Sequence, residues 1–275
     1  MIPGPRFGLI VIGDEILSGR REDKHLSKVV ALLSARGLEL SWAHYLPDDR
    51  LAICEFLRRS MSGNDIVFST GGIGGTPDDH TRQAAAMAAE VPLKRDTEAE
   101  SYIIARATAM AEKEGKPLPI DTTRPEYQQR LTMADLPLGC DLIPNPYNQI
   151  AGFSIKQHFF VPGFPVMAWP MIEWVLDTGY DHLFHQRPKL EKSAVVFDVY
   201  EAQITGLMQA IEKHHAGIKV FSLPSVGDAT IGRHIELGVK GDAARVDAAF
   251  DELLKGLEAF NARIGETLVR GDVPA

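Results

Sequence analysis

The sequence is poor in cysteine, in basic charge and in long apolar runs. Of its 275 residues only Cys54 and Cys140 are cysteines, too few for a CxxC motif or a disulfide framework, so we expect two buried thiols in a reducing cytoplasm. Lysine and arginine number 29 against 37 aspartates and glutamates, a net charge of −8. Without a broad positive field, neither nucleic acid nor an anionic membrane surface is an expected partner.

The longest early apolar run, residues 7–13, is too short to span a membrane. Asp14 and Glu15 follow it, where a signal peptide would have small residues. We therefore predict a cytoplasmic protein. The composition is otherwise ordinary, with 45% hydrophobic and 24% charged residues, and the chain is long enough for a core that needs neither disulfides nor a structural metal.

Strand and helix patterns alternate over the first third of the chain. Continuous apolar runs at 7–13 and 65–70 are typical of strands buried on both faces, and 38–46 reads as a further strand. Apolar residues recur at helical spacing over 24–36, and an alanine-rich helix is expected over 79–89. This alternation predicts an α/β fold whose mostly parallel sheet is the middle of three layers.

The composition changes at residues 179–190, which are polar, aromatic and interrupted by proline. We place a domain boundary there, between a domain over 1–180 and a smaller α+β domain over 190–275 with the element order βαββα. Residues 190–266 contain 8 basic and 12 acidic residues, which argues against an RNA-binding module. The expected role of the smaller domain is an oligomer contact or a lid.

The strongest chemical feature is the segment 69–79, with the sequence STGGIGGTPDD. It leaves a predicted buried strand and enters a predicted helix, and its four glycines allow several backbone N–H groups to converge on one point. The helix N-terminus that follows adds a positive dipole end, so the segment suits a phosphate. It has neither the GK[ST] ending of a P-loop nor GxGxxG spacing. The alternative is a loop that only reverses the chain.

Carboxylates follow three of the predicted strands. They form the pairs Asp14-Glu15, Asp48-Asp49 and Asp78-Asp79. Open parallel sheets bind ligands at the carboxyl ends of their strands, so the pairs are expected to converge there. They would repel a bare phosphate but would bind one through Mg²⁺ or another divalent metal. The alternative is that Asp48 and Asp79 only cap helices and that the first pair lies in a solvated turn.

A third feature is the segment 13–19, GDEILSG, which can supply a hydroxyl, carboxylates and backbone donors to a ligand. Together with Asp48-Asp49 and with 69–79 followed by Thr81-Arg82, it resembles the MoaB/Mog-like molybdopterin-binding fold. Within that group the chain is most similar to the N-terminal part of the competence/damage-inducible protein A (CinA) family, over residues 6–178. Asn145-Pro146, Gly152-Phe153 and 161–165 also follow in the order of that family, and the smaller domain resembles the one that comes next. The amidase domain of longer members has no counterpart in this sequence.

The resemblance implies a pocket for a phosphorylated pterin or an adenine nucleotide. Some relatives adenylate molybdopterin with MgATP and some CinA members hydrolyse ADP-ribose, so it implies pyrophosphate hydrolysis or nucleotidyl transfer. The alternative is a non-catalytic molybdopterin- or nucleotide-binding protein or sensor. It further implies a homo-oligomer, either a dimer or a trimer. Asp49 and Asp79 are the expected catalytic residues and, with Asp78, the expected metal ligands.

The predicted binding set comes from the three motifs and the turn at 161–165. Its members are Gly13, Asp14, Glu15, Ser18, Gly19, Ser69, Thr70, Gly71, Gly72, Gly74, Gly75, Thr76, Pro162 and Gly163.

The sequence departs from the family pattern at several positions. Gly75 stands where proline is common, Met167 where glutamate is usual, and Trp169 where a polar residue is usual. Residues 132–134 read TMA in place of Lys-Gln-Ala, and the loop 145–153 lacks the usual glycine and proline. These changes remove polar groups from the far side of the expected pocket, and we expect phosphate binding to survive them.

Overall fold

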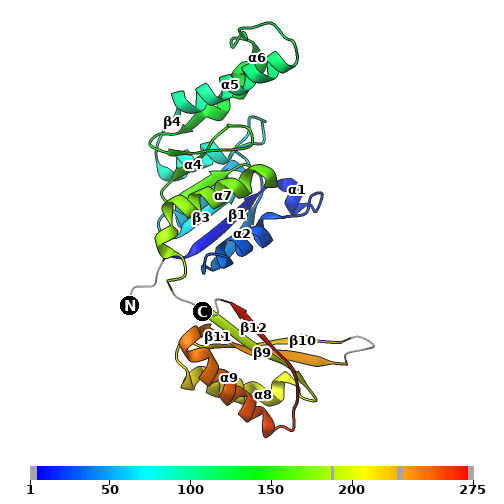
Figure 1. Ribbon diagram of the computed structural model, residues 1–275. Coiled ribbons are helices and arrows are strands. Elements are labelled where there is room, and N and C mark those ends of the chain that lie inside the picture. The colour runs from blue at the N-terminus through cyan, green and yellow to red at the C-terminus, as the bar shows by residue number, and fades with distance from the viewer. Residues whose placement is uncertain (1–4, 187–188, 228–231, 272–275) are drawn as a thin grey trace. The chain divides into compact units, whose positions relative to one another are not determined.

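A computed structural model of the chain describes residues 5–186, 189–227 and 232–271, and divides them between two units (Figure 1). The larger unit comprises Met1–Ala35 and Glu39–His182, and the smaller comprises Leu183–Ala275 with Arg36–Leu38. A six-stranded sheet forms the centre of the larger unit. Its order is β2 (Leu40–Leu46), β1 (Phe7–Ile12), β3 (Ile66–Thr70), β8 (His158–Val161), β7 (Gly152–Ile155) and β6 (Asp141–Ile143). The first four strands are parallel, and β7 and β6 complete the sheet in antiparallel fashion.

Helices cover both faces of this sheet, as the continuous apolar runs predict. Every residue of β1 and β3 is buried. α2 (His25–Ser34) and α7 (Pro165–Gly179) pack together on one face (Figure 1), and α3 (Arg50–Ser60) and α4 (Thr81–Ala89) pack together against the other. The predicted three-layer, mostly parallel α/β fold is therefore confirmed.

A segment that we call the α5–α6 arm, residues 96–134, lies at one end of the larger unit (Figure 1). It contains α5 (Thr97–Lys113), α6 (Pro125–Leu131) and the short 3₁₀ helix η1 (Thr132–Ala134). A two-stranded antiparallel sheet of β4 (Leu93–Arg95) and β5 (Asp135–Pro137) joins its two ends. The Asp96 side chain caps α5 by accepting hydrogen bonds from the backbone N–H groups of Glu98 and Ala99.

The smaller unit has one strand more than the predicted βαββα pattern. In chain order its strands and helices are β9 (Lys189–Phe197), α8 (Glu201–His214), β10 (Lys219–Ser225), β11 (His234–Asp242), α9 (Ala243–Glu258) and β12 (Arg263–Gly271); the 3₁₀ helix η2 (Asp181–Leu183) lies at the boundary of the two units in the sequence. The sheet order β10-β11-β9-β12, with every pair antiparallel, is a ferredoxin-like arrangement. The prediction missed β12 because that strand is almost wholly exposed and lacks a run of alternating apolar residues.

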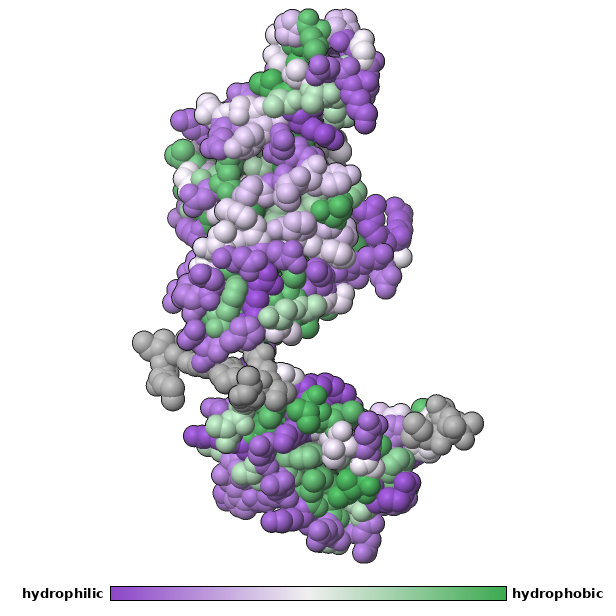
Figure 2. Space-filling view, viewed as in Figure 1, coloured by the Kyte–Doolittle hydropathy of each residue, from purple (hydrophilic) through white to green (hydrophobic). Residues whose placement is uncertain are grey.

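The surfaces of the two units differ in character. In Figure 2 hydrophobic residues gather on the visible face of the smaller unit, while they are scattered among hydrophilic residues on the larger unit. Within the described ranges no helix is both long enough and apolar enough to cross a membrane.

Candidate functional site

A cavity of about 490 Å³ lies in the larger unit, where β1 and β3 end. Most of its walls come from four segments: the start of α1 (Asp14–Leu17), the glycine segment after β3, the turn between β8 and α7, and the loop before β7; Arg21, His25, Asp48 and Met133 complete them. This is the edge where a parallel sheet is expected to bind a ligand. The predicted residues that line it are Gly13, Glu15, Thr70, Gly71, Gly72, Gly74, Gly75, Thr76, Asp78, Asp79, Pro162 and Gly163.

The carbonyl groups of the glycine loop, residues 71–76, are held by donors from the surrounding protein. The Gly71 carbonyl accepts from the Thr81 hydroxyl at 3.0 Å, and the Gly72 carbonyl accepts from the Thr81 N–H at 2.9 Å. The Gly74 carbonyl accepts from Arg82 Nη2 at 2.6 Å. The Gly75 carbonyl accepts from Gln129 Nε2 at 2.5 Å. Four of the loop's carbonyls therefore point into the protein.

The amide groups of the same loop are arranged in the opposite way. The N–H of Gly71 donates to the Val161 carbonyl, but in the part of the chain that the structure describes the N–H groups of residues 72–75 donate to no acceptor. Within a planar trans peptide, the C=O of one residue and the N–H of the next point in opposite directions. Anchoring the carbonyls of residues 71, 72 and 74 therefore turns the N–H groups of Gly72, Ile73 and Gly75 away from the anchoring groups, and all three of these residues line the cavity.

The first two residues of the loop must be glycine. Gly71 has a φ of +101° and Gly72 a φ of +66°, which side chains rarely adopt. A Cβ on Gly71 would lie 2.2 Å from the carbonyl oxygen of Ile12, and one on Gly72 would lie 2.2 Å from Thr81 Oγ1. The close approach of this loop to β1 and α4 therefore requires residues without a side chain at positions 71 and 72.

Asp14 and Asp48 tie the end of β1 to the end of β2. The Asp14 N–H donates to Asp48 Oδ2 at 2.8 Å, and the Asp48 N–H donates to Asp14 Oδ1 at 3.3 Å. Partial burial raises the pKa of Asp48 above its ordinary value of 3.8, and the charges of Asp14, Glu15 and Asp78 raise it further, against the opposing effect of the hydrogen bond from Asp14. Carboxylates from all three predicted pairs thus influence one group.

The structure exchanges the expected roles of two adjacent aspartates. Asp49, predicted as catalytic and metal-binding, is the N-cap of α3 and accepts from the Ala52 N–H at 2.8 Å. Asp48, for which a cap was the alternative, lines the cavity instead. Either carboxylate can serve as a cap, so the sequence does not distinguish them, and a shift of one position changes which side chain faces the ligand site.

Asp79 closes the glycine loop. Its Oδ2 atom accepts from the Thr76 N–H at 2.7 Å and from the Thr76 hydroxyl at 2.5 Å. The helix α4 begins two residues later than expected, with His80 at its N-cap position, so Asp79 does not cap it. Asp79 lies at the cavity as predicted, but both hydrogen bonds to its carboxylate serve the geometry of the loop.

The predicted metal ligands do not form a metal site by themselves. Among the residues that the structure describes, no group of three or more histidine, cysteine, aspartate or glutamate side chains could hold a metal ion. Asp49 faces its own helix, and Asp79 is engaged by Thr76. A protein-only site on Asp49, Asp78 and Asp79 is therefore not present in the described residues.

Other residues of the predicted binding set lie outside the cavity lining. The hydroxyl of Ser69 is fully buried and has no partner among the described residues, whereas Thr70 does line the cavity. Ser18 is exposed and its hydroxyl is 3.4 Å from the Glu15 carbonyl. Gly19 is exposed and has a φ of +73°. These residues shape the ends of β1 and β3 or the turn after α1.

Two polar cavity residues, Arg21 and His25, were not predicted. Arg21 is the only arginine or lysine in the described lining; its Nη1 lies 3.5 Å from Glu15 Oε1 and its guanidinium lies 5.9 Å from the centre of the Phe164 ring. His25 is 4% exposed, and its Nε2 is 3.0 Å from the Gly163 carbonyl. Neither residue stands in a motif with the glycine loop, so no local signal identifies them.

The rest of the lining combines apolar and amide side chains. Met133, Ile150 and Met167 line the cavity, as do Asn145 and Asn148. They include the departures from the family pattern at Met167, in the 132–134 segment and in the 145–153 loop. The cavity thus offers apolar surface as well as the polar groups of the glycine loop and the carboxylates.

Comparisons with known proteins show the family of the chain. A family model described as "Probable molybdopterin binding domain" matches residues 8–182. A CinA-like protein of Citrifermentans bemidjiense is 33% identical over 211 residues, which cover 74% of this chain and 47% of that protein. A protein of Pyrobaculum arsenaticum is 28% identical over 264 residues, covering 90% of this chain and 94% of its own.

A solved structure is also similar. The protein CinA of Thermoplasma acidophilum, described as having unknown function, has a TM-score of 0.51 and 25% identity, and the match covers 62% of this chain and 96% of that one. The chain spans about half the length of the CinA-like relative from Citrifermentans. The resemblance that the three motifs predict is confirmed by these matches.

Proposed function

The chain belongs to the family of probable molybdopterin-binding domains, and from this premise we propose that it binds a phosphorylated pterin or an adenine nucleotide. In this proposal the phosphate oxygens accept hydrogen bonds from the N–H groups of Gly72, Ile73 and Gly75. The observation that carries the proposal is the set of consecutive unpaired amides beside the cavity, opposite the anchored carbonyls of the same loop.

The size and polarity of the cavity support a ligand with a ring at one end and a phosphate at the other. About 490 Å³ lies within the range of small-molecule sites. The apolar surface, with Ile150 and Met167, suits a flat ring, and Phe164 stands exposed at the same cavity. Pterin and adenine both meet this description, so the proposal names both.

A divalent metal would have to arrive with the ligand. Mg²⁺ commonly uses one or two carboxylates together with phosphate oxygens and waters, and this needs no preformed protein cage. Asp48 and Asp78 line the cavity and would be the carboxylates nearest to such a metal, in place of the predicted Asp49. We assign no chemical step to the metal.

We propose cleavage of a phosphoanhydride, as in ADP-ribose, as the reaction class. Non-catalytic binding is the second candidate, and a specific observation favours it: of the two predicted catalytic carboxylates, Asp49 caps a helix and Asp79 holds the loop. The two candidates share the same anion site and differ only in turnover.

Calorimetric titration with ADP-ribose, ADP and a pterin phosphate, with and without Mg²⁺, tests the binding proposal. Adenosine and the unphosphorylated pterin are the controls. Phosphorylated ligands are expected to bind and their unphosphorylated counterparts to bind at least tenfold more weakly. Equal binding of ADP-ribose and adenosine would refute the assignment of the phosphate to the glycine loop.

Product analysis of the same samples separates the two candidates. Conversion of ADP-ribose to AMP and ribose 5-phosphate supports the enzyme, and tight binding without products supports the binding protein. The variant Gly72→Ala, whose Cβ would lie 2.2 Å from Thr81 Oγ1, should abolish binding in either case.

A further inference from the structure

Two side chains from different elements hold successive carbonyls of the glycine loop. Arg82, on α4, is 3% exposed and donates through Nη2 to the Gly74 carbonyl. Gln129, on α6, is exposed and donates through Nε2 to the Gly75 carbonyl. Arg82 thus holds the peptide group that contains the Gly75 N–H, one of the donors proposed to bind phosphate. Gln129 holds the next peptide group, which contains the Thr76 N–H, so the two contacts fix Gly75 on both sides.

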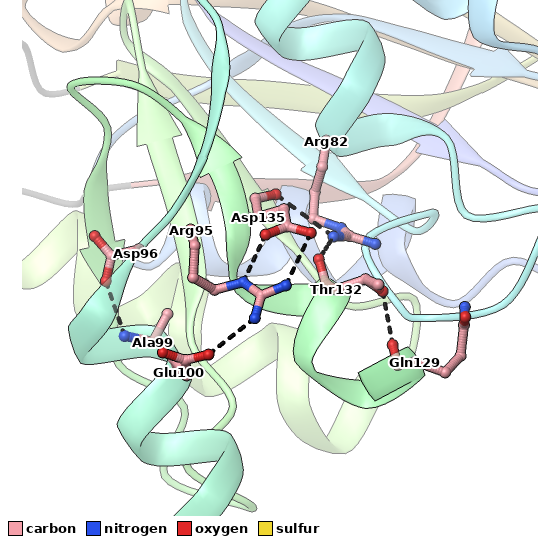
Figure 3. Close-up of polar contacts among 8 residues, drawn as sticks. All are labelled: Arg82, Arg95, Asp96, Ala99, Glu100, Gln129, Thr132 and Asp135. Atoms are coloured by element: carbon pink, nitrogen blue, oxygen red, sulfur yellow. Dashed lines mark hydrogen bonds and ion pairs between the residues drawn. The ribbon is translucent and has the colours of Figure 1, made fainter. Parts of the chain in front are cut away.

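Arg82 also connects the loop to the α5–α6 arm. Its Nη1 donates to the Thr132 carbonyl in η1 and lies 3.5 Å from the Asp135 carbonyl in β5 (Figure 3). The Thr132 hydroxyl in turn donates to the Gln129 carbonyl at 2.7 Å. The guanidinium therefore bridges the loop and the arm segment that carries Gln129.

The base of the arm is fixed by a separate ion-pair network. Arg95 pairs with Asp135 at 2.6 Å and with Glu100 at 2.8 Å, and these residues come from β4, β5 and α5 (Figure 3). The Asp96 N–H donates to the Ala134 carbonyl at 2.8 Å. With its base held in this way, the arm reaches the loop through α6 and η1, where Met133 is also in contact range of Gly75.

We propose that Gln129 and Arg82 are positioning residues for the bound anion, and that the α5–α6 arm senses the occupancy of the glycine loop. The inference rests on the proposed function. Without Arg82, the peptide group between Gly74 and Gly75 is free to rotate, and rotation would turn the Gly75 N–H away from the anion. Without Gln129, the following peptide group loses the contact at its carbonyl, and Gly75, with its N–H, is free to shift away from the anion. Gln129 makes this contact from an exposed position on a short helix, so its removal leaves the core of the larger unit intact.

The test compares Gln129→Glu with Gln128→Glu. Both replace an exposed amide on α6 by a carboxylate of the same size. Gln129→Glu removes the donor to the Gly75 carbonyl, while Gln128→Glu removes a donor to the Thr122 carbonyl within the arm. Inorganic pyrophosphate is the probe, titrated by calorimetry into the full chain.

Gln129→Glu is expected to bind pyrophosphate about tenfold more weakly than the wild type at an unchanged melting temperature, and Gln128→Glu is expected to bind it like the wild type. Gln129→Ala, which adds no charge, must weaken binding as well. Hydrogen exchange gives a second readout: pyrophosphate should slow exchange over 125–134 in the wild type and in Gln128→Glu, but not in Gln129→Glu.

Wild-type affinity in both Gln129 variants would overturn this inference and leave the proposed function standing. Failure of the wild type itself to bind pyrophosphate or any phosphorylated ligand would overturn both. Arg82→Lys keeps the charge but loses the fork that reaches two carbonyls, so a folded Arg82→Lys protein should also bind more weakly.

Discussion

Alanine substitutions at the neighbouring glycines Gly74 and Gly75 form a matched pair. They test the steric effect of an added side chain in the loop without straining the backbone conformation. Neither residue has a φ in the left-handed region, so alanine strains the backbone of neither. A Cβ on Gly74 would lie 2.6 Å from Asp79 Oδ2, the atom that accepts both hydrogen bonds from Thr76. A Cβ on Gly75 would lie 3.3 Å from the Gln129 carbonyl and 3.5 Å from Met133 Cγ, which is tight but close to ordinary contact.

Gly74→Ala must therefore displace the Asp79 carboxylate from Thr76. Overpacking of this kind costs about 1–3 kcal/mol, and the loosened turn lies directly beside the proposed phosphate donors, so we also expect pyrophosphate affinity to fall about tenfold or more. Gly75→Ala needs a shift of only a few tenths of an ångström, and we expect it to cost less than about 1 kcal/mol and to retain most of the affinity.

Urea unfolding followed by tryptophan fluorescence measures the free energy of unfolding of the larger unit. The three tryptophans of the chain, Trp42, Trp169 and Trp174, all belong to the larger unit that contains the loop. Calorimetric titration of pyrophosphate gives the affinities. Equal stability and affinity of Gly74→Ala and Gly75→Ala would refute the argument that Asp79 fixes the loop through Thr76.

Three further outcomes are expected. Asp48→Asn should bind sulfate more tightly than the wild type near neutral pH; moreover, since the raised pKa of Asp48 means that its charge is acquired as pH rises above 3.8, wild-type sulfate affinity should fall more over that rise than the variant's. Burial lowers the pKa of His158 below 6.5, so the folded state keeps the ring neutral and the stability that this contributes is present above pH 6.5 and lost as pH falls below it; urea titrations should therefore show a smaller loss of stability for His158→Gln than for the wild type as the pH falls from 8 to 5.5. Leu253→Ala, at a fully buried position of α9, should destabilise the smaller unit by about 2–5 kcal/mol in calorimetry while leaving the tryptophan-detected transition unchanged.

Local patterns in the sequence were sufficient for the layered architecture and for the glycine loop. The strands β1 and β3 are buried along their whole length because both faces of the sheet are covered, and such burial removes the alternation of apolar and polar residues from the sequence. The glycines at 71 and 72 are equally local, since a left-handed backbone and close contacts with Ile12 and Thr81 exclude any side chain. The order of these motifs along the chain was enough to identify the family.

The tertiary structure alone decided which polar groups face the ligand. Asp48 and Asp49 are chemically identical neighbours, and only the register at which α3 begins turns one to the cavity and the other to its helix. Gln129 contacts Gly75 although 54 positions separate them in the sequence, and Arg21 contacts Phe164 through the packing of separate loops. Neither pair has a regular sequence spacing from which the contact could be predicted. Hydrophobic periodicity and the positions of glycines follow from the local conformation of the backbone, so they can be read from the sequence. The direction of an exposed polar side chain depends on the residues that the tertiary structure places next to it.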